Sequence, residues 1–262
     1  MIRKTFIALL LVFGTVTSAA AADIVTFKGT TTTEIGDMLM LTGKLTKPKG
    51  DGPFHAVVVL HGCSGLHKYF DVWAERLASW GYVTLQVDSF GPRGESNICR
   101  DSILIYDLLT KRAQDAYDAK SYLVGLPFVD PNRIAVMGWS HGGWTTLFVV
   151  RTTSLAQKRE DPFRAAIAFY PYCSVPLDDL NAPLLILIGE LDDWCPASMC
   201  FSRMPLGKTV HEVILKVHPR ACHCFDWEGI DVNYMGHRLQ YDPAAAADAI
   251  IQVREFLVKH FQ

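Results

Sequence analysis

The chain has 262 residues, of which 50% are hydrophobic and 20% are charged, and its formal net charge is −2. A chain of this length and apolar content can bury the core of one α/β domain of ordinary size. It contains no segment rich in Lys and Arg, which argues against nucleic acid or an anionic membrane surface as a partner.

The first 22 residues have the order of a secretory signal peptide. Arg3 and Lys4 form a basic head, an apolar run covers residues 6–13, and small residues end the segment at Ala22. The apolar run is too short to span a bilayer. We expect residues 1–22 to be removed on export, which leaves residues 23–262 as a single periplasmic or secreted domain without a membrane anchor. Loss of the two basic residues changes the formal charge to −4, since 23 basic residues then face 27 acidic ones.

Apolar runs bounded by turns alternate with segments of helical periodicity along the rest of the chain. The first two runs, at 24–28 and 38–45, predict strands that lie antiparallel at one edge of a sheet. Further strands are expected at 56–60, 82–88, 133–138, 165–171, 183–189 and 212–219, and helices at 70–80, 103–126, 144–156 and 244–261. This alternation predicts an α/β fold with a mostly parallel, doubly wound sheet and helices on both faces.

A serine follows the strand expected at 133–138. Residues 138–142 read Gly-Trp-Ser-His-Gly, a G-x-S-x-G sequence between a predicted strand and a predicted helix. This is the nucleophile-elbow pattern, in which a sharp turn lifts the serine oxygen clear of the sheet. The pattern makes Ser140 the candidate nucleophile.

A serine hydroxyl needs a base, and the base needs a carboxylate to orient it. His223 follows the last predicted strand and is the preferred base, with His218 as the alternative. Asp192 follows the preceding strand and is the preferred acid, with Asp193 as the alternative. The chain order Ser, Asp, His is that of the α/β-hydrolase triad.

Other residues near the strand ends suit the stabilisation and binding of a substrate. The backbone N–H groups of Cys63 and His141 are candidates for an oxyanion hole. Trp139 and Trp194 flank the candidate nucleophile and acid, where they form either an apolar substrate wall or plain packing. Arg93 either binds a substrate carboxylate or belongs to a structural ion pair.

Several stretches resemble the dienelactone hydrolase family of α/β hydrolases, in particular its exported branch. They read VVLHGCSGL, DSFGPRG, DPNRIAVMGWSHGG, AFYPYC, LILIGELDDWCP and HPRACHCFD. The family acid, in a G-E-x-D-x-x-x-P segment, falls on Asp192, and the family histidine falls on His223. The resemblance implies the α/β-hydrolase fold and hydrolysis of small-molecule esters or lactones. The chain departs from the family pattern by carrying Ser140 in place of cysteine and by lacking an arginine just after Phe225.

Acyl transfer through Ser140 needs no metal or organic cofactor. Residues 222–224 read Cys-His-Cys without a second cluster at metal-site spacing, so we expect no metal site. The alternatives to a hydrolase are a non-catalytic binding protein and an acyltransferase on the same fold.

Seven cysteines suit an oxidising compartment, and their odd number leaves at least one thiol unpaired. Strand adjacency in the fold implied by the resemblance suggests Cys63–Cys99 and Cys173–Cys200 as disulfides.

Overall fold

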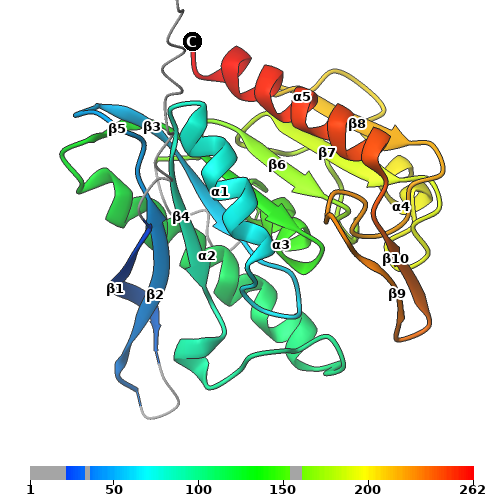
Figure 1. Ribbon diagram of the computed structural model, residues 1–262, viewed down its shortest axis with the longest axis horizontal. Coiled ribbons are helices and arrows are strands. Elements are labelled where there is room, and N and C mark those ends of the chain that lie inside the picture. The colour runs from blue at the N-terminus through cyan, green and yellow to red at the C-terminus, as the bar shows by residue number, and fades with distance from the viewer. Residues whose placement is uncertain (1–21, 33–35, 154–160) are drawn as a thin grey trace, which may run out of the picture.

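A computed structural model describes residues 22–32, 36–153 and 161–262, so the predicted signal peptide, apart from Ala22, lies outside the described residues. Eight strands form one sheet in the order β1-β2-β4-β3-β5-β6-β7-β8 (Figure 1). Their bounds are β1 Ala22–Thr32, β2 Met38–Thr46, β3 Phe54–Leu60, β4 Val83–Asp88, β5 Val129–Trp139, β6 Ala166–Phe169, β7 Leu184–Gly189 and β8 Val213–His218.

The sheet is parallel from β4 through β8 and antiparallel only where β2 joins β1 and β4. This confirms the predicted mostly parallel sheet with two antiparallel strands at one edge. Val57, Val58 and Val59 of the central strand β3 are fully buried, because layers of helices cover both faces of the sheet.

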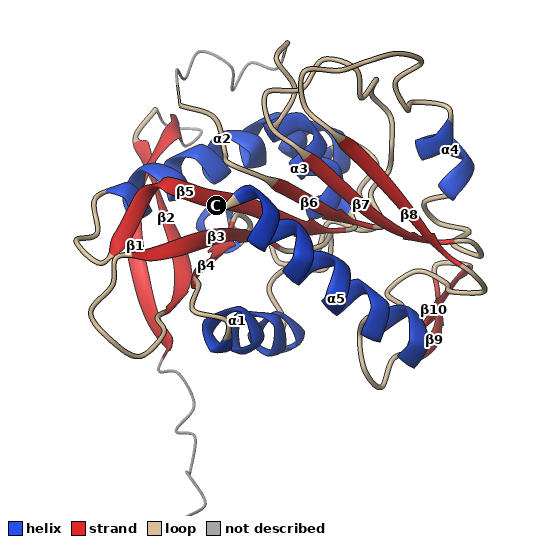
Figure 2. Cartoon of the chain, turned by 90° about the horizontal axis from the view of Figure 1, so that it is seen from above, coloured by secondary structure: helices blue, strands red, loops and turns tan. Residues whose placement is uncertain are grey.

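Helices α1 (Tyr69–Ser79) and α5 (Pro243–His260) lie on one face of the sheet, and α2 (Leu104–Val124) and α3 (His141–Val149) lie on the other (Figure 2). A short helix, α4, covers Ala197–Phe201. In the described part of the chain, no helix is both long enough and apolar enough to cross a membrane.

Helix α3 ends earlier than the sequence pattern predicted. Its last residue is Val149, and Arg151 already pairs in an isolated β-bridge with Leu180. The end of the predicted helix is rich in β-branched residues, whose restricted side chains disfavour helix. The final part of the predicted helix, residues 154–156, lies outside the described residues.

The sequence pattern missed a β-hairpin made of β9 (Asp231–Tyr234) and β10 (His237–Gln240). Its two turn residues, Met235 and Gly236, both have positive φ, of 53° and 89°, as in a type I′ turn. His223 pairs with Leu239 in a bridge, and Gln240 N donates to His223 O over 3.1 Å. The hairpin is therefore attached to the loop that carries His223.

Candidate active site

Ser140 sits on a strained turn between β5 and α3. Its φ of 52° and ψ of −116° are far from helical or extended values, although it is not glycine. A Cβ at Gly138 would lie 2.2 Å from the Gly142 carbonyl oxygen, and one at Gly142 would lie 2.1 Å from Leu60 O. The two glycines of the G-x-S-x-G sequence are therefore required by the close approach of strand, turn and helix.

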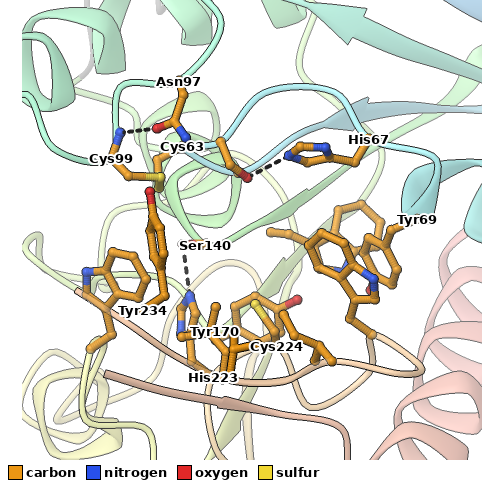
Figure 3. Close-up of a pocket in the computed structure, with 18 of the residues that line it drawn as sticks. Cys63, His67, Tyr69, Asn97, Cys99, Ser140, Tyr170, His223, Cys224 and Tyr234 are labelled. Carbon is orange, nitrogen blue, oxygen red and sulfur yellow. Dashed lines mark hydrogen bonds between the residues drawn. A yellow bond between two sulfur atoms is a disulfide. The ribbon is translucent and has the colours of Figure 1, made fainter. Parts of the chain in front are cut away.

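Ser140, His223 and Asp192 form a continuous hydrogen-bonded chain. His223 Nε2 lies 3.0 Å from Ser140 Oγ (Figure 3), and His223 Nδ1 lies 2.7 Å from Asp192 Oδ2. The second carboxylate oxygen of Asp192 accepts from the backbone N–H groups of Trp194 and Cys195, at 3.0 and 2.7 Å. The two backbone donors hold the Asp192 carboxylate against the His223 imidazole. Both residues are buried, so their hydrogen bond is shielded from water.

The structure does not bring the alternative acid and base to Ser140. Asp193 is half exposed and lies 3.4 Å from His237 Nδ1. His218 ends β8, with its Nδ1 3.6 Å from the Asp248 carboxylate. Within the described residues, no group of three or more His, Cys, Asp and Glu side chains could hold a metal ion.

The two candidate oxyanion donors flank Ser140 from different elements. His141 is the first residue of α3, where backbone N–H groups have no acceptor within the helix. Cys63 follows β3, and a Cβ at its neighbour Gly62 would lie 3.7 Å from Ser140 Cβ. Cys63 is bonded to Cys99 in a disulfide, and its carbonyl accepts from Ile98 N over 2.9 Å. The loop after β3 is thereby tied to the segment after β4.

Arg112 is a buried residue that sequence reasoning missed. This α2 side chain is fully buried, donates through Nη2 to His61 O over 2.6 Å and contacts His141 Nδ1 through Nη1. Because a guanidinium only donates, His141 Nδ1 must accept, and His141 Nε2 then donates to Ile105 O over 2.7 Å. A signal was present, since Arg112 falls among the apolar positions of helix α2 at a spacing of three or four residues.

The histidines beside Arg112 are held neutral. Burial, followed by the Arg112 charge, lowers the pKa of His141 to about 3. Burial and Arg112 also lower the pKa of His61 well below its usual value. Both rings therefore act as neutral hydrogen-bonding groups under the site rather than as bases.

Ser140 borders two cavities. The first, of about 250 Å³, has His223 in its wall, and the second, of about 350 Å³, has His141. The Cys63–Cys99 disulfide and Trp194 border both. Trp194 stacks on His237 with ring centroids 4.9 Å apart. The first cavity is also lined by Tyr69, Phe70, Trp139, Tyr170, Trp227, Ile230, Val232, Tyr234 and Leu239.

Asp226 organises the aromatic wall of the first cavity and was not foreseen from the sequence. It accepts hydrogen bonds from Trp139 Nε1 at 3.0 Å, from Tyr170 OH at 2.8 Å and from Tyr69 OH. Trp73 Nε1 also donates to it over 3.0 Å. Burial and the Asp226 carboxylate raise the pKa of both tyrosines well above the usual value. Trp139 thus borders the cavity and packs in the core at once.

The structure does not bring Arg93 to either cavity. Its guanidinium makes two 2.8 Å bonds to the buried Asp115 carboxylate and donates to Ser89 O and Thr31 Oγ1. Burial raises the pKa of Asp115, and the bonds to Arg93 oppose that shift. Of the two roles expected for Arg93, the geometry matches the structural ion pair, because its guanidinium is bonded to Asp115 and lines neither cavity.

The cysteines pair as the resemblance implied. The structure contains Cys63–Cys99 and Cys173–Cys200 disulfides, and it leaves Cys195, Cys222 and Cys224 as buried free thiols. The odd number of cysteines required at least one unpaired thiol, and the structure has three.

A family model described as the dienelactone hydrolase family matches residues 41–261. The chain belongs to the dienelactone hydrolase family. This dienelactone hydrolase family member is 27% identical, over 172 residues, to a Bradyrhizobium protein provisionally named 2-oxo-3-(5-oxofuran-2-ylidene)propanoate lactonase, with 59% of this chain and 66% of that protein covered. It is 23% identical to a Yersinia pestis protein provisionally named carboxymethylenebutenolidase, with 84% of each covered.

Solved structures show the same fold for this dienelactone hydrolase family member. A dienelactone hydrolase from Anabaena variabilis superimposes with a TM-score of 0.67 at 20% identity and covers 94% of this chain and 100% of its own. At that identity the likeness shows the α/β-hydrolase fold alone. The chain is thus an α/β hydrolase related to carboxylic ester hydrolases, and it spans slightly less than two thirds of the Bradyrhizobium relative.

Proposed function

We propose that this protein hydrolyses carboxylic ester or lactone bonds of small molecules through Ser140, His223 and Asp192. The observation that carries the proposal is the unbroken chain from Ser140 Oγ to His223 Nε2 at 3.0 Å and from His223 Nδ1 to Asp192 Oδ2 at 2.7 Å. Nucleophile, base and orienting acid on three strand ends of this fold form the arrangement used for acyl transfer.

The reaction has two steps, acylation of Ser140 and hydrolysis of the acyl-enzyme. In the first, Ser140 Oγ attacks the ester carbonyl carbon while His223 Nε2 takes the serine proton, and the backbone N–H groups of Cys63 and His141 stabilise the oxyanion. The bond to the alcohol oxygen then breaks, and the His223 proton passes to that oxygen. In the second step, water gives a proton to His223 as its oxygen attacks the acyl carbon. The bond between that carbon and Ser140 Oγ then breaks, His223 returns the proton to Ser140 Oγ, and the acid is released. Asp192 holds the His223 tautomer and stabilises the imidazolium throughout.

The test is the Ser140→Ala variant measured on a panel of ester, lactone and peptide substrates. We expect loss of about 10³-fold or more in kcat for esters or lactones, since the nucleophile is removed. The exposed Ser202 on the turn after α4 supplies a matched control, because its hydroxyl bonds only Met199 O locally, and Ser202→Ala should retain full activity. A fluorophosphonate should label the wild type and Ser202→Ala but leave Ser140→Ala unmodified. Full esterase activity in Ser140→Ala would refute the proposal, and acyl transfer to an added alcohol in preference to water would favour an acyltransferase.

We further propose that the chain is exported. Two disulfides favour an oxidising compartment, and the sequence of residues 1–22 has the order of a signal peptide. Mass spectrometry of the protein from its natural host should find Asp23 at the N-terminus. A chain that keeps Arg3 and Lys4 would contradict this.

A further inference from the structure

The two cavities at Ser140 differ in the catalytic group that each contains. His223 lines the first cavity and not the second, whereas His141 lines the second and not the first. In the proposed reaction, the alcohol oxygen takes its proton from His223 Nε2 as it leaves. The substituent on that oxygen therefore lies on the His223 side of Ser140, which is the first cavity.

The first cavity presents mainly ring carbons, although Ser64, His67 and Asn97 also line it. Tyr69 and Tyr170 point their hydroxyl groups at Asp226, and Trp139 does the same with its indole N–H. Figure 3 shows Tyr69, Tyr170 and Tyr234 around Ser140 and His223. Since Asp226 occupies these polar ends, the rings turn toward the cavity as an apolar surface.

The charges around this cavity disfavour an anionic group. None of the described residues that line it is Lys, Arg, Asp or Glu. Two carboxylates lie directly behind lining residues: Asp192, which is bonded to His223, and Asp226, whose four hydrogen-bond donors are all neutral. A carboxylate brought into the cavity would lose its hydration, find no Lys or Arg among the lining residues and face the Asp226 charge through one layer of rings.

The second cavity is different. It is lined by Arg100, Asp101 and Ser102 together with Tyr106, Trp144 and Tyr172. Arg100 is exposed, and its guanidinium lies 5.8 Å from the ring centroid of Tyr234, on the outer side of the first cavity's wall. This side of Ser140 therefore offers both apolar and charged contacts, and it imposes no comparable barrier to an anionic acyl group.

We propose that the first cavity binds the alcohol half of the substrate and selects neutral, apolar alcohols, with a preference for an aromatic ring. This inference rests on the proposed function, because it uses the proton transfer from His223. The cavity of about 250 Å³ is small, so the alcohol group is of the size of one ring on a short linker rather than a long chain.

The test compares acetate esters whose alcohols have similar acidity: 2-phenylethyl, pentyl and 3-carboxypropyl acetate. We expect kcat/KM for pentyl acetate to exceed that for its nearly isosteric anionic partner, 3-carboxypropyl acetate, by about 100-fold, since the carboxylate is desolvated without a partner. The 2-phenylethyl ester should exceed the pentyl ester by about threefold through ring contacts. Equal rates for the pentyl and 3-carboxypropyl esters would overturn the proposal.

A second comparison uses esters whose acyl group, rather than the alcohol group, carries the negative charge. Methyl hexanoate and monomethyl glutarate form a neutral and an anionic pair with a common methanol leaving group. We expect the neutral ester to be preferred by less than about tenfold, because the second cavity includes Arg100. Stronger discrimination on the acyl side than on the alcohol side would overturn the assignment of the cavities.

Two substitutions to arginine test the location. Val232 lines the first cavity and is 46% exposed, so Val232→Arg introduces a cation at its edge without burying it. This variant should raise the rate for 3-carboxypropyl relative to pentyl acetate at least about tenfold. Val258 on α5 is equally exposed at 47% and lines neither cavity, so Val258→Arg should leave the ratio unchanged. An unchanged ratio in both variants would count against the cavity assignment.

The proposed function and this inference fail in distinguishable ways. If Ser140→Ala retains the wild-type rate on these esters, the proposed function is wrong. If hydrolysis depends on Ser140 but the anionic alcohol is accepted as readily as the neutral one, only the substrate inference is wrong.

Discussion

Arg112 of α2 and His141, the residue that follows Ser140, share a buried hydrogen bond between the guanidinium Nη1 and the imidazole Nδ1. The same guanidinium donates through Nη2 to the backbone oxygen of His61. Cys63 follows His61 by two residues in the chain. Arg112 therefore joins the two segments whose N–H groups we propose as the oxyanion hole.

We expect Arg112→Lys to lower kcat by about 10- to 100-fold while KM changes by less than about threefold. A lysine ammonium is a point charge and lacks the planar fork that reaches His61 O and His141 Nδ1 together. Misplaced oxyanion donors weaken binding of the transition state more than binding of the ground-state ester. Steady-state kinetics on one neutral ester measures the split.

The neighbouring residue on α2 supplies the control. Lys111 is half exposed and pairs with Asp107 at 2.6 Å, so Lys111→Met removes a cation from the same helix turn without touching the site. Its kcat should match the wild type, and its thermal midpoint should change little. If Arg112→Lys loses activity only in proportion to its unfolded fraction, Arg112 is a structural residue and not a positioning residue.

The neutral histidines beside Arg112 predict a loss of stability in acid. Burial lowers the pKa of His141 to about 3, and it lowers that of His61 as well, so the unfolded chain binds more protons than the folded one below pH 6.5. Stability is therefore fully present above pH 6.5 and falls as pH drops toward 3, by about 1.4 kcal/mol per pH unit for each histidine. Urea unfolding at pH 7, 6, 5 and 4 measures the slope. His141→Gln should reduce that slope by up to one proton, and an identical slope in this variant would contradict the assignment.

Much of the sheet was predictable because parallel strands that are buried on both faces have continuous runs of apolar residues in the sequence. The run at 56–60 is the buried part of β3, and the run at 183–189 contains β7, whose residues are all buried. The β9–β10 hairpin was missed for the converse reason, since strand β9 is largely exposed and its residues follow no alternating apolar pattern. Its turn signal is a single glycine after Met235, without the Asn or Asp that usually marks a type I′ turn.

The triad candidates were predictable because a doubly wound sheet brings the carboxyl ends of its strands to one rim. Asp192 was already the preferred acid from the sequence, the resemblance supported that choice, and the hydrogen bond between His223 and Asp192 agrees with it. The burial of Arg112 had a signal in its helical spacing, but the roles of Arg112 and Asp226 were not predicted because they depend on contacts across 29 to 157 positions of sequence. The spacing of residues within one helix or strand does not indicate which distant residues they contact.

The adjacent aspartates give a sharp internal comparison. Asp192 lies 2.7 Å from His223 Nδ1 and is buried, whereas Asp193 is half exposed and faces His237. Asp192→Asn should lower kcat by about 10³- to 10⁴-fold, because the amide fails to stabilise the imidazolium and favours the wrong tautomer. Asp193→Asn should change kcat by less than about threefold. Parallel kinetics on the two variants decides the acid, and a larger loss in Asp193→Asn would reverse the assignment.

The two disulfides provide a controlled comparison, because they close loops of similar length and only Cys63–Cys99 borders the cavities at Ser140. The sequence separations are 36 and 27 residues, so replacing either pair by serines should lower the free energy of unfolding by about 3–4 kcal/mol.

Only the Cys63–Cys99 pair borders both cavities and carries a proposed oxyanion donor. The double variant Cys63→Ser/Cys99→Ser should therefore also lose kcat, by about tenfold or more, when measured well below its unfolding temperature. Cys173→Ser/Cys200→Ser should lose stability but retain kcat, because neither residue lines a cavity beside Ser140. Equal kcat in the two double variants would mean that the loop after β3 holds its position without the bridge, and that the contacts of Arg112 with His61 and His141 are enough to hold the two donors.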